Sequence, residues 1–198
     1  MLLLPPPDAP DTRPRYHISV HMNYFIPTSY ITVVRKGATE NGQCVGEFEM
    51  GLSERRSTVT IGQYETFLSS VLSRTGSHLN GEYHWRNLDL HLYWDCRGRL
   101  FKVRAPTLLA LNLVFSVLNS SPLQCFMIND VTKARAALAI YESPGLHDLR
   151  REGIDLVHCL EVTPDGQEHF DLILLSVLII ERKRLTPLGK DLGKRLDA

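Results

Sequence analysis

Eight histidines are the residues of this chain whose chemistry would most readily build a metal or catalytic site. Two pairs stand out, His17 with His21 and His84 with His91. Both pairs fall in β-prone segments, and in an extended strand such spacings separate the rings by more than about 10 Å. One metal ion cannot bind two rings that far apart. We therefore predict a solvated or hydrogen-bonded structural role for each histidine, and we assign no metal ligand.

A hydrolase triad is the second chemistry that the residue types suggest, because His169 and Asp171 precede Ser176 near the end of the chain. Ser176, however, lies between Leu175 and Val177 in an otherwise apolar run, where a serine is expected in the core. The sequence also lacks Gly-x-Ser-x-Gly, a phosphate-binding glycine loop and a nucleotide-binding fingerprint. We assign no catalytic residue and predict a non-enzymatic protein.

The cysteines fit neither a disulfide framework nor a zinc site. Four are present, widely spaced and without a Cys-x-x-Cys motif: Cys44, Cys96, Cys125 and Cys159. His158 adjoins the last of them, but structural zinc sites do not commonly use adjacent ligands. The opening residues Met1–Pro7 lack the basic and apolar regions of a secretory signal. We therefore predict reduced core thiols in an intracellular protein that holds no metal or cofactor.

Aromatic and basic side chains offer surfaces for binding rather than catalysis. Four aromatic residues could form such a surface, but we expect most of them in the core: Tyr83, Trp85, Tyr93 and Trp94, the last with Arg99 over its ring. Two basic clusters stand out: Lys102 and Arg104 with His91, and Arg182, Lys183, Arg184, Lys190, Lys194 and Arg195. Acidic residues dilute both clusters, namely Asp89 opposite Arg104, and Glu181, Asp191 and Asp197. We expect solvated surfaces there rather than an anion or headgroup site.

Short β-prone runs dominate the first part of the chain, at Tyr16–Val20, Ser29–Val34, Cys44–Phe48 and Ser57–Ile61. The Asn41-Gly42 pair favours a hairpin between the second and third runs, because both residue types accept positive φ. A helix is predicted over Gln63–Arg74, ended by Gly76. Its apolar residues recur at helical spacing: Tyr64, Phe67, Leu68, Val71 and Leu72.

The clearest local pattern covers Leu88–Arg104, where apolar and polar residues alternate up to Trp94 and Asp95–Gly98 turns the chain. One register sorts both faces of the predicted hairpin: Trp94 with Arg99, Leu92 with Phe101, Leu90 with Val103, His91 with Lys102 and Asp89 with Arg104. Further strands are predicted at Leu108–Leu118, Leu123–Ile128, Ala134–Tyr141 and Leu156–Val162, of which the third could equally be helical.

The segment Phe170–Ile180 is apolar on every face, so it belongs in a buried position or in a membrane. As a helix it would rise roughly 16 Å against about 30 Å of bilayer hydrocarbon, so we predict a core helix and no transmembrane segment. Asp165 with Glu168 resembles a capping box, although the turn at Thr163–Gln167 leaves a hairpin strand open. A helix that needs walls on all sides points to a closed β-barrel.

Length and charge set the remaining limits. The 198 residues suffice for one sizeable core, and we predict a disordered Pro-rich tail over 1–14, one domain over 15–186 and a polar tail over 187–198. Lys plus Arg and Asp plus Glu both number 22, so no net charge draws the chain to nucleic acid.

Three features together resemble a known family: Glu82-Tyr-His-Trp-Arg86, the strand end Trp94-Asp95 with Gly98 beyond it, and the closing run Phe170–Arg184. Over about residues 16–185 the chain resembles an uncharacterised fungal domain family of the tubby C-terminal-like group, which includes the plant LURP-one-related proteins and the phospholipid scramblases. The resemblance implies an α+β, mainly β fold, a closed antiparallel β-barrel around a buried hydrophobic C-terminal helix. Tubby binds phosphoinositide headgroups through basic residues, but those positions do not match this chain, so no site residue carries over.

These features predict an uncharacterised intracellular binding or interaction module whose partner is a phospholipid headgroup or a protein. The resemblance leaves an alternative of another class, a scramblase-like, membrane-associated lipid protein. An enzyme of unrecognised type is the third interpretation, which a deep pocket lined by His84, His91 or His158 would favour.

Overall fold

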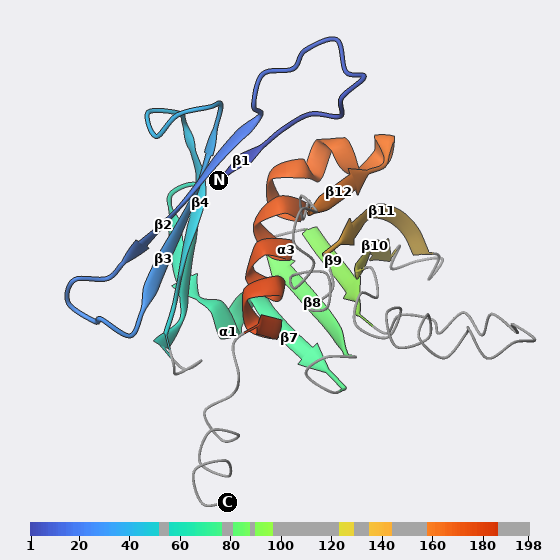
Figure 1. The fold of residues 1–198 in the computed structure, drawn as a ribbon. Coiled ribbons are helices and arrows are strands. Elements are labelled where there is room, and N and C mark those ends of the chain that lie inside the picture. The colour runs from blue at the N-terminus through green and yellow to red at the C-terminus, as the bar shows by residue number, and fades with distance from the viewer. Residues whose placement is uncertain are drawn as a thin grey trace, which may run out of the picture. The chain divides into compact units, whose positions relative to one another are not determined.

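The structure is a computed structural model that describes residues 1–51, 56–76, 81–87, 90–96, 123–128, 135–143 and 158–185. Within these residues the strands form two antiparallel sheets of six strands each (Figure 1). The chain groups into two compact units, Met1–Leu72 with Leu174–Ala198, and Ser73–Ile173. The first sheet belongs to the first unit, and the second sheet belongs to the second unit apart from Leu72. The sequence-based boundaries at 15 and 186 stay a prediction.

The first sheet is a meander in which each strand pairs with the next along the chain. Its strands are β1 (Leu2–Leu3), β2 (Tyr16–Met22), β3 (Tyr30–Lys36), β4 (Cys44–Met50), β5 (Thr58–Ile61) and β6 (Tyr64–Phe67). The four β-prone runs predicted in this region are confirmed as β2 to β5. β1 lies within the segment predicted as a tail, and it pairs Leu3 with Tyr16 of β2.

The predicted hairpin around Asn41-Gly42 is confirmed, because β3 and β4 pair as antiparallel neighbours. The Lys36 N–H donates to the Gln43 carbonyl at 2.9 Å and closes the loop. A Cβ atom at Gly42 would collide with the Lys36 carbonyl oxygen. This close approach of two backbone segments requires glycine at that position.

The helix predicted over Gln63–Arg74 is wrong. The chain instead forms β6, a single helical turn α1 (Leu68–Val71) and then β7 (Leu72–Thr75). Pairing of β6 with β5, which sets Tyr64 opposite Ile61, replaces the helical hydrogen bonds of the first half. The helical spacing predicted that these apolar residues share one buried face, but Tyr64 is exposed while Leu68 and Leu72 are buried. Long-range pairing thus overrides local periodicity here.

The second sheet has the order β12-β11-β10-β9-β8-β7. After β7 its strands are β8 (Glu82–Asn87), β9 (Leu90–Asp95), β10 (Leu123–Ile128), β11 (Arg135–Glu142) and β12 (Cys159–Val162). The strand predicted at Leu123–Ile128 is confirmed, and the ambiguous Ala134–Tyr141 segment is a strand. β12 covers only the end of the run predicted at Leu156–Val162, and Leu108–Leu118 lies outside the described residues.

The alternation predicted for the strand ending at Trp94 is confirmed, since Leu92 and Trp94 are buried and Tyr93 is half-buried. The partner predicted for this strand is not confirmed. Leu92 pairs with Trp85 on β8 and with Met127 on β10, so both of its backbone edges are used. The predicted pairing of Leu92 with Phe101 therefore has no free edge, and residues 99–104 lie outside the described part of the chain.

The C-terminal apolar segment is confirmed as a helix, α3 (Phe170–Leu185), whose residues from Ile173 to Ile180 are largely buried. A 3-10 helix, η3 (Pro164–His169), leads into it. The capping residue is Thr163 rather than the predicted Asp165. The Thr163 hydroxyl accepts from the Gly166 N–H at 3.3 Å, and Pro164 takes the first helical position, where it needs no N–H partner.

The predicted closed barrel is wrong. The described strands form two open sheets, with β1 and β6 at the edges of the first and β12 and β7 at the edges of the second. Although β6 and β7 are consecutive, α1 lies between them in the chain, and no ladder joins them within the described residues. An apolar helix requires apolar surroundings, but that requirement does not dictate the hydrogen-bond partners of surrounding strands. Burial of α3 therefore does not imply closure.

Candidate functional site

Two of the four histidines considered for metal binding make local contacts, whereas the buried Nδ1 of His17 has no hydrogen-bond partner among the described residues. The His21 imidazole Nε2 lies 2.9 Å from the Ser19 hydroxyl. The His84 ring packs edge-on against Tyr93 with centroids 4.9 Å apart, and its Nε2 lies 3.8 Å from the Glu82 carboxylate. Across the β8–β9 ladder, His84 and His91 occupy different pairs. Among the residues that the structure describes, no group of three or more His, Cys, Asp or Glu side chains could hold a metal ion.

The triad that residue types suggested does not form an accessible site. Ser176 is 0% exposed in the middle of α3, as its apolar neighbours predict. A nucleophile must be reached by its substrate. Three of the four aromatic residues weighed as a surface are likewise core groups, since Tyr83, Trp85 and Trp94 are all fully buried.

The thiols divide into two classes. Cys96 and Cys125 are buried as predicted, whereas Cys44 and Cys159 are exposed, and all four are free. Burial raises the pKa of the Cys125 thiol. Partial burial and the carboxylates of Glu161 and Glu142 raise the pKa of the Cys159 thiol. A thiol held protonated is a poor nucleophile, so the exposed Cys159 is not an activated one.

Only the helical part of the second basic cluster lies in the described chain. The Arg182 guanidinium lies over the Tyr30 ring, 5.5 Å from its centroid. Arg184 forms a largely buried ion pair with Glu181 at 3.2 Å. Lys190, Lys194 and Arg195, and the other predicted cluster at Lys102 and Arg104, lie outside the described residues.

The strongest candidate surface is the apolar end of the β2–β3 hairpin, which we call the β2–β3 tip. It consists of six exposed side chains on the two strand ends and the loop between them: Val20, Met22, Tyr24, Phe25, Ile26 and Tyr30. Tyr24 is 89% exposed and Phe25 is 96% exposed. Contiguous exposed apolar side chains of this kind mark binding surfaces.

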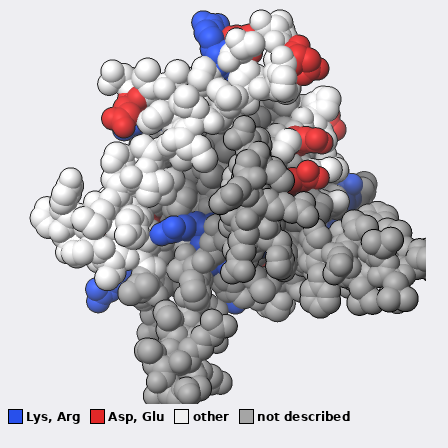
Figure 2. All heavy atoms as spheres, viewed as in Figure 1, with Lys and Arg blue, Asp and Glu red and all other residues white. Residues whose placement is uncertain are grey.

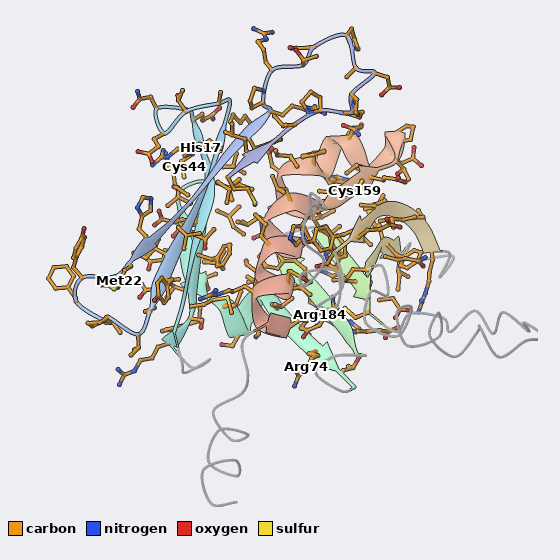
Figure 3. The ribbon with its side chains drawn as sticks, in the orientation of Figure 1. His17, Met22, Cys44, Arg74, Cys159 and Arg184 are labelled. Carbon is orange, nitrogen blue, oxygen red and sulfur yellow. The ribbon has the colours of Figure 1, made fainter. Side chains whose placement is uncertain are left out.

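The strands place part of this surface. Met22 pairs directly with Tyr30, so the two side chains share one face of the sheet. The same face carries Tyr16 and Ile18, which are buried, and Val20, which is 60% exposed. An apolar stripe along β2 therefore continues from the core to the surface. Figure 3 shows Met22 toward the hairpin end of β2, and His17 and Cys44 toward the opposite end of the sheet.

Asn23 fixes the loop that carries the aromatic residues. Its side-chain Oδ1 accepts from the Phe25 N–H at 2.9 Å and from the Ile26 N–H at 3.2 Å. Its Nδ2 donates to the Glu49 carboxylate on β4 at 2.7 Å. The Asn23 N–H donates to the Ser29 carbonyl at 2.9 Å and closes the loop. Tyr24 and Phe25 are thus presented by a hydrogen-bonded turn.

The basic residues of the β2–β3 hairpin lie mostly at the end of its strands opposite the β2–β3 tip. From residue 15 to residue 39 the sequence contains Arg15, Arg35 and Lys36 and no Asp or Glu. In the space-filling view, the protruding end of the hairpin shows no acidic side chain (Figure 2). Arg182 adds a cation beside Tyr30 at the base of the β2–β3 tip. Arg35 and Lys36 pair with His17 and Tyr16 at the end of the ladder opposite the tip, and the Glu49 carboxylate lies beside Asn23, so apolar character rather than charge distinguishes this surface.

The sequence reasoning missed this site, although a signal was present. Met22-Asn-Tyr-Phe-Ile26 places four large apolar residues where two strands must be joined. Connections between strands are ordinarily polar, so apolar residues there are unexplained by folding alone. The six side chains of the β2–β3 tip are apolar or aromatic, so the chemistry on which this surface can be argued is binding.

Among the helices in the described residues, none combines the length and the apolar character that crossing a bilayer requires.

Comparison with known proteins finds no matching family model, no matching curated protein and no matching solved structure. The tubby-like resemblance therefore stays a prediction, and the function must be argued from the β2–β3 tip.

Proposed function

We propose that this chain is a non-enzymatic binding module that attaches to a membrane surface by inserting the β2–β3 tip into the lipid headgroup region. The observation that carries the proposal is the near-complete exposure of Tyr24 and Phe25 on a turn held by Asn23. Exposed aromatic side chains are unfavourable in water and favourable at the membrane interface, where one end of the ring is apolar and the other wet.

The shape of the surface supports a lipid partner over a protein groove. Tyr24 and Phe25 project from a loop that also carries the exposed apolar Ile26, and the exposed Met22 precedes the loop at the end of β2. A loop can insert into an interface without a complementary pocket. The insertion costs little ordering, because the Asn23 hydrogen bonds already hold the turn.

One cation lies close enough to the β2–β3 tip to favour an anionic leaflet. Arg182 lies over the ring of Tyr30, whereas Arg35 and Lys36 lie near the other end of the strands, where Lys36 pairs with Tyr16. Near a surface rich in anionic lipid, such a cation contributes up to about 1 kcal/mol of attraction. Anionic lipid is concentrated in cytoplasmic leaflets, so the proposal includes an intracellular site of action.

Vesicle flotation tests the proposal with a matched pair of variants. Tyr24→Ser with Phe25→Ser removes the two aromatic side chains of the β2–β3 tip. Tyr64→Ser with Phe67→Ser removes the same residue types from β6, where they are 73% and 60% exposed. Burying one large apolar side chain contributes roughly 1.5–3 kcal/mol, so the first variant should lose more than tenfold in partition to anionic vesicles. The second should float like the wild type.

Three results would contradict the proposal. Equal flotation of the Tyr24/Phe25 variant and the wild type would show that the β2–β3 tip does not insert. Equal losses in both variants would indicate nonspecific adsorption of aromatic side chains. A wild-type chain that floats with neither zwitterionic nor anionic vesicles would leave the β2–β3 tip as a surface for a protein partner.

A further inference from the structure

We infer that β2 forms the interface of a weak homodimer, in which the open part of its edge pairs antiparallel with the same strand of a second copy of this chain. The edge in question is the side of β2 opposite β3. The inference goes beyond the proposed function, because it uses backbone groups of β2 rather than the aromatic side chains of the β2–β3 tip.

The strand β1 covers only the first part of this edge, where it pairs with Tyr16 and His17. The Ile18 N–H then donates to the Met1 carbonyl at 2.8 Å, and the Ile18 carbonyl accepts from the Met1 amino group at 2.7 Å. Within the described residues no ladder covers the rest of the edge, Ser19–Met22. Figure 1 shows β2 running on past β1 to the hairpin end.

The hydrogen-bonding groups of Val20 and Met22 point away from β3. Along an antiparallel strand, the N–H and C=O groups of every second residue point to the same side. Ile18 bonds to the side of β1, whereas the Asn23 N–H donates to the Ser29 carbonyl on the side of β3. The β2–β3 ladder has no register shift, so Val20 and Met22 follow Ile18 and each direct one donor and one acceptor toward the open edge.

This part of the edge lacks the features that keep sheet edges from pairing. Natural proteins protect an exposed edge with a charged side chain, a proline or a bulge. The run Ser19-Val-His-Met22 contains no Lys, Arg, Asp, Glu or Pro, and its ladder is regular. Beyond β1, the described edge strands are β6, β7 and β12, and each carries an exposed charged side chain: Glu65, Arg74 and Glu161. The open part of β2 is therefore suited to a further strand.

A second copy supplies that strand in one register. With His21 of each copy on a two-fold axis, Val20 of one pairs with Met22 of the other, which forms four backbone hydrogen bonds. An axis at Val20 would set Met22 opposite Ile18, whose groups are already bonded. An axis at Met22 would set Val20 opposite the loop that follows β2. Only the register centred on His21 uses all four free groups.

The same register brings exposed apolar side chains together. Val20 is 60% exposed and Met22 is 48% exposed, and the two share one face of the sheet. In the dimer each lies directly opposite the other residue type across the junction. The pairing is thus self-complementary in hydrogen bonds and in side chains, as a two-fold interface requires. Its small area predicts a weak dimer, with a Kd on the order of 100 µM.

Cysteine crosslinking in the full-length chain tests the register. The exposed thiols are first removed by Cys44→Ser and Cys159→Ser, which leaves the two buried ones. His21→Cys and Ser19→Cys are then compared in this background, at a protein concentration of about 100 µM with copper phenanthroline as the oxidant. Both positions lie on the same face of β2, so they form a matched pair.

The two positions differ in their distance from their counterparts. Position 21 meets its own counterpart across the axis with Cβ atoms about 4.5–5.5 Å apart, which is close enough for a disulfide after a small adjustment. Position 19 lies at least about 13 Å from its counterpart, because the two are four residues apart along the strands. We expect crosslinking through position 21 to be at least tenfold faster than through position 19.

Blocking the edge should abolish the fast crosslinking. Val20→Pro removes an N–H that points to the open edge, so the ladder with β3 loses no donor. Val20→Lys keeps the N–H and places a charge on the edge. Each change, made in the His21→Cys chain, should slow the crosslinking at least tenfold. Unchanged amide protection in β3 and β4 verifies that each variant is folded.

Amide exchange in the unmodified chain gives a second readout. The amides of Val20 and Met22 should exchange more slowly as the protein concentration rises through the Kd, since the dimer bonds them. The amides of Ser19 and His21 face β3 and should keep their rates. Protection of Val20 and Met22 that is independent of concentration would mean that the same chain covers the edge, and it would overturn the inference.

Equal crosslinking through positions 19 and 21 would indicate random encounter and would also overturn the inference. The same holds if the fast crosslinking survives both Val20 variants, or if position 21 does not crosslink at all. None of these results bears on the vesicle test, because Tyr24 and Phe25 lie outside the paired residues.

Discussion

At the scale of single residues, Asn23 links the fold to the proposed function. One amide side chain accepts from two N–H groups of the loop and donates to Glu49 on β4. Asparagine suits this position because its oxygen and its nitrogen serve opposite roles at once. The loop that carries Tyr24 and Phe25 is therefore anchored to the sheet through a single residue.

Replacing Asn23 should loosen the β2–β3 tip without unfolding the sheet. In Asn23→Ala the Phe25 N–H loses its acceptor, whereas the Ile26 N–H keeps the backbone carbonyl of residue 23 at 3.2 Å; a hydrogen bond of this kind contributes about 0.5–1.5 kcal/mol. Hydrogen exchange at the Phe25 amide should accelerate by about tenfold, while amides of β3 and β4 keep their rates. Glu49→Gln keeps an acceptor for the Asn23 amide and leaves the Asn23 oxygen in place, so it should preserve most of the protection. Unchanged exchange in Asn23→Ala would refute the anchoring role.

At the scale of elements, the contact between α3 and β4 depends on a missing side chain. Gly46 faces Leu175 of α3, whose Cδ2 would lie 2.9 Å from a Cβ atom at Gly46. The Thr60 carbonyl oxygen on β5 would lie 2.8 Å away from the same atom. The backbone of β4 therefore allows the helix to approach closely, and leucine occupies the space that a strand side chain would otherwise take.

The variant Gly46→Ala should destabilise the chain, because both the helix and β5 would have to shift. Overpacking of a buried site typically costs about 1–3 kcal/mol, and chemical denaturation monitored by tryptophan fluorescence would measure it. Gly51→Ala is the matched control, since its nearest neighbour beyond the adjacent residues is the Ser29 hydroxyl at 3.4 Å. That substitution should change the stability by less than about 0.5 kcal/mol. Equal effects of the two would refute the close approach.

At the scale of the whole molecule, folding divides four chemically equal thiols into two pairs. Cys96 and Cys125 are 1% and 0% exposed, whereas Cys44 and Cys159 are open to solvent. Neither composition nor spacing distinguishes these pairs, because each cysteine lies in or beside a β-prone segment. Only the faces that the two sheets bury decide which thiols a reagent can reach.

A thiol reagent should therefore modify two cysteines in the native chain and all four after denaturation. Cys159 should react more slowly than Cys44, because its raised pKa lowers the thiolate fraction at a given pH. The rate for Cys159 should keep rising as the pH passes the ordinary thiol pKa, and Cys44→Ser isolates it for measurement. Rapid native modification of Cys125 would contradict the buried face of β10.

The sequence by itself determined the elements whose causes are local. Alternation over Leu90–Asp95 marked β9, the Asn41-Gly42 turn marked the β3–β4 hairpin, and a run with nine apolar residues among the eleven from Phe170 marked α3. Each signal lies in residues that are neighbours in the sequence, so it can be read without knowledge of what packs against the element. The local nature of the signal explains why these predictions held.

Only the tertiary structure decided which elements pair and which surfaces remain exposed. Leu92 bonds across to Met127 rather than to the nearby residues that match it equally well in polarity, because polarity fixes the face of a strand but not its partner. The closed barrel was predicted wrongly for the same reason, because the polarity of the strands does not fix which strand edges pair. The exposure of Tyr24 and Phe25 likewise depends on where the sheet ends, so composition alone could not distinguish a binding surface from core.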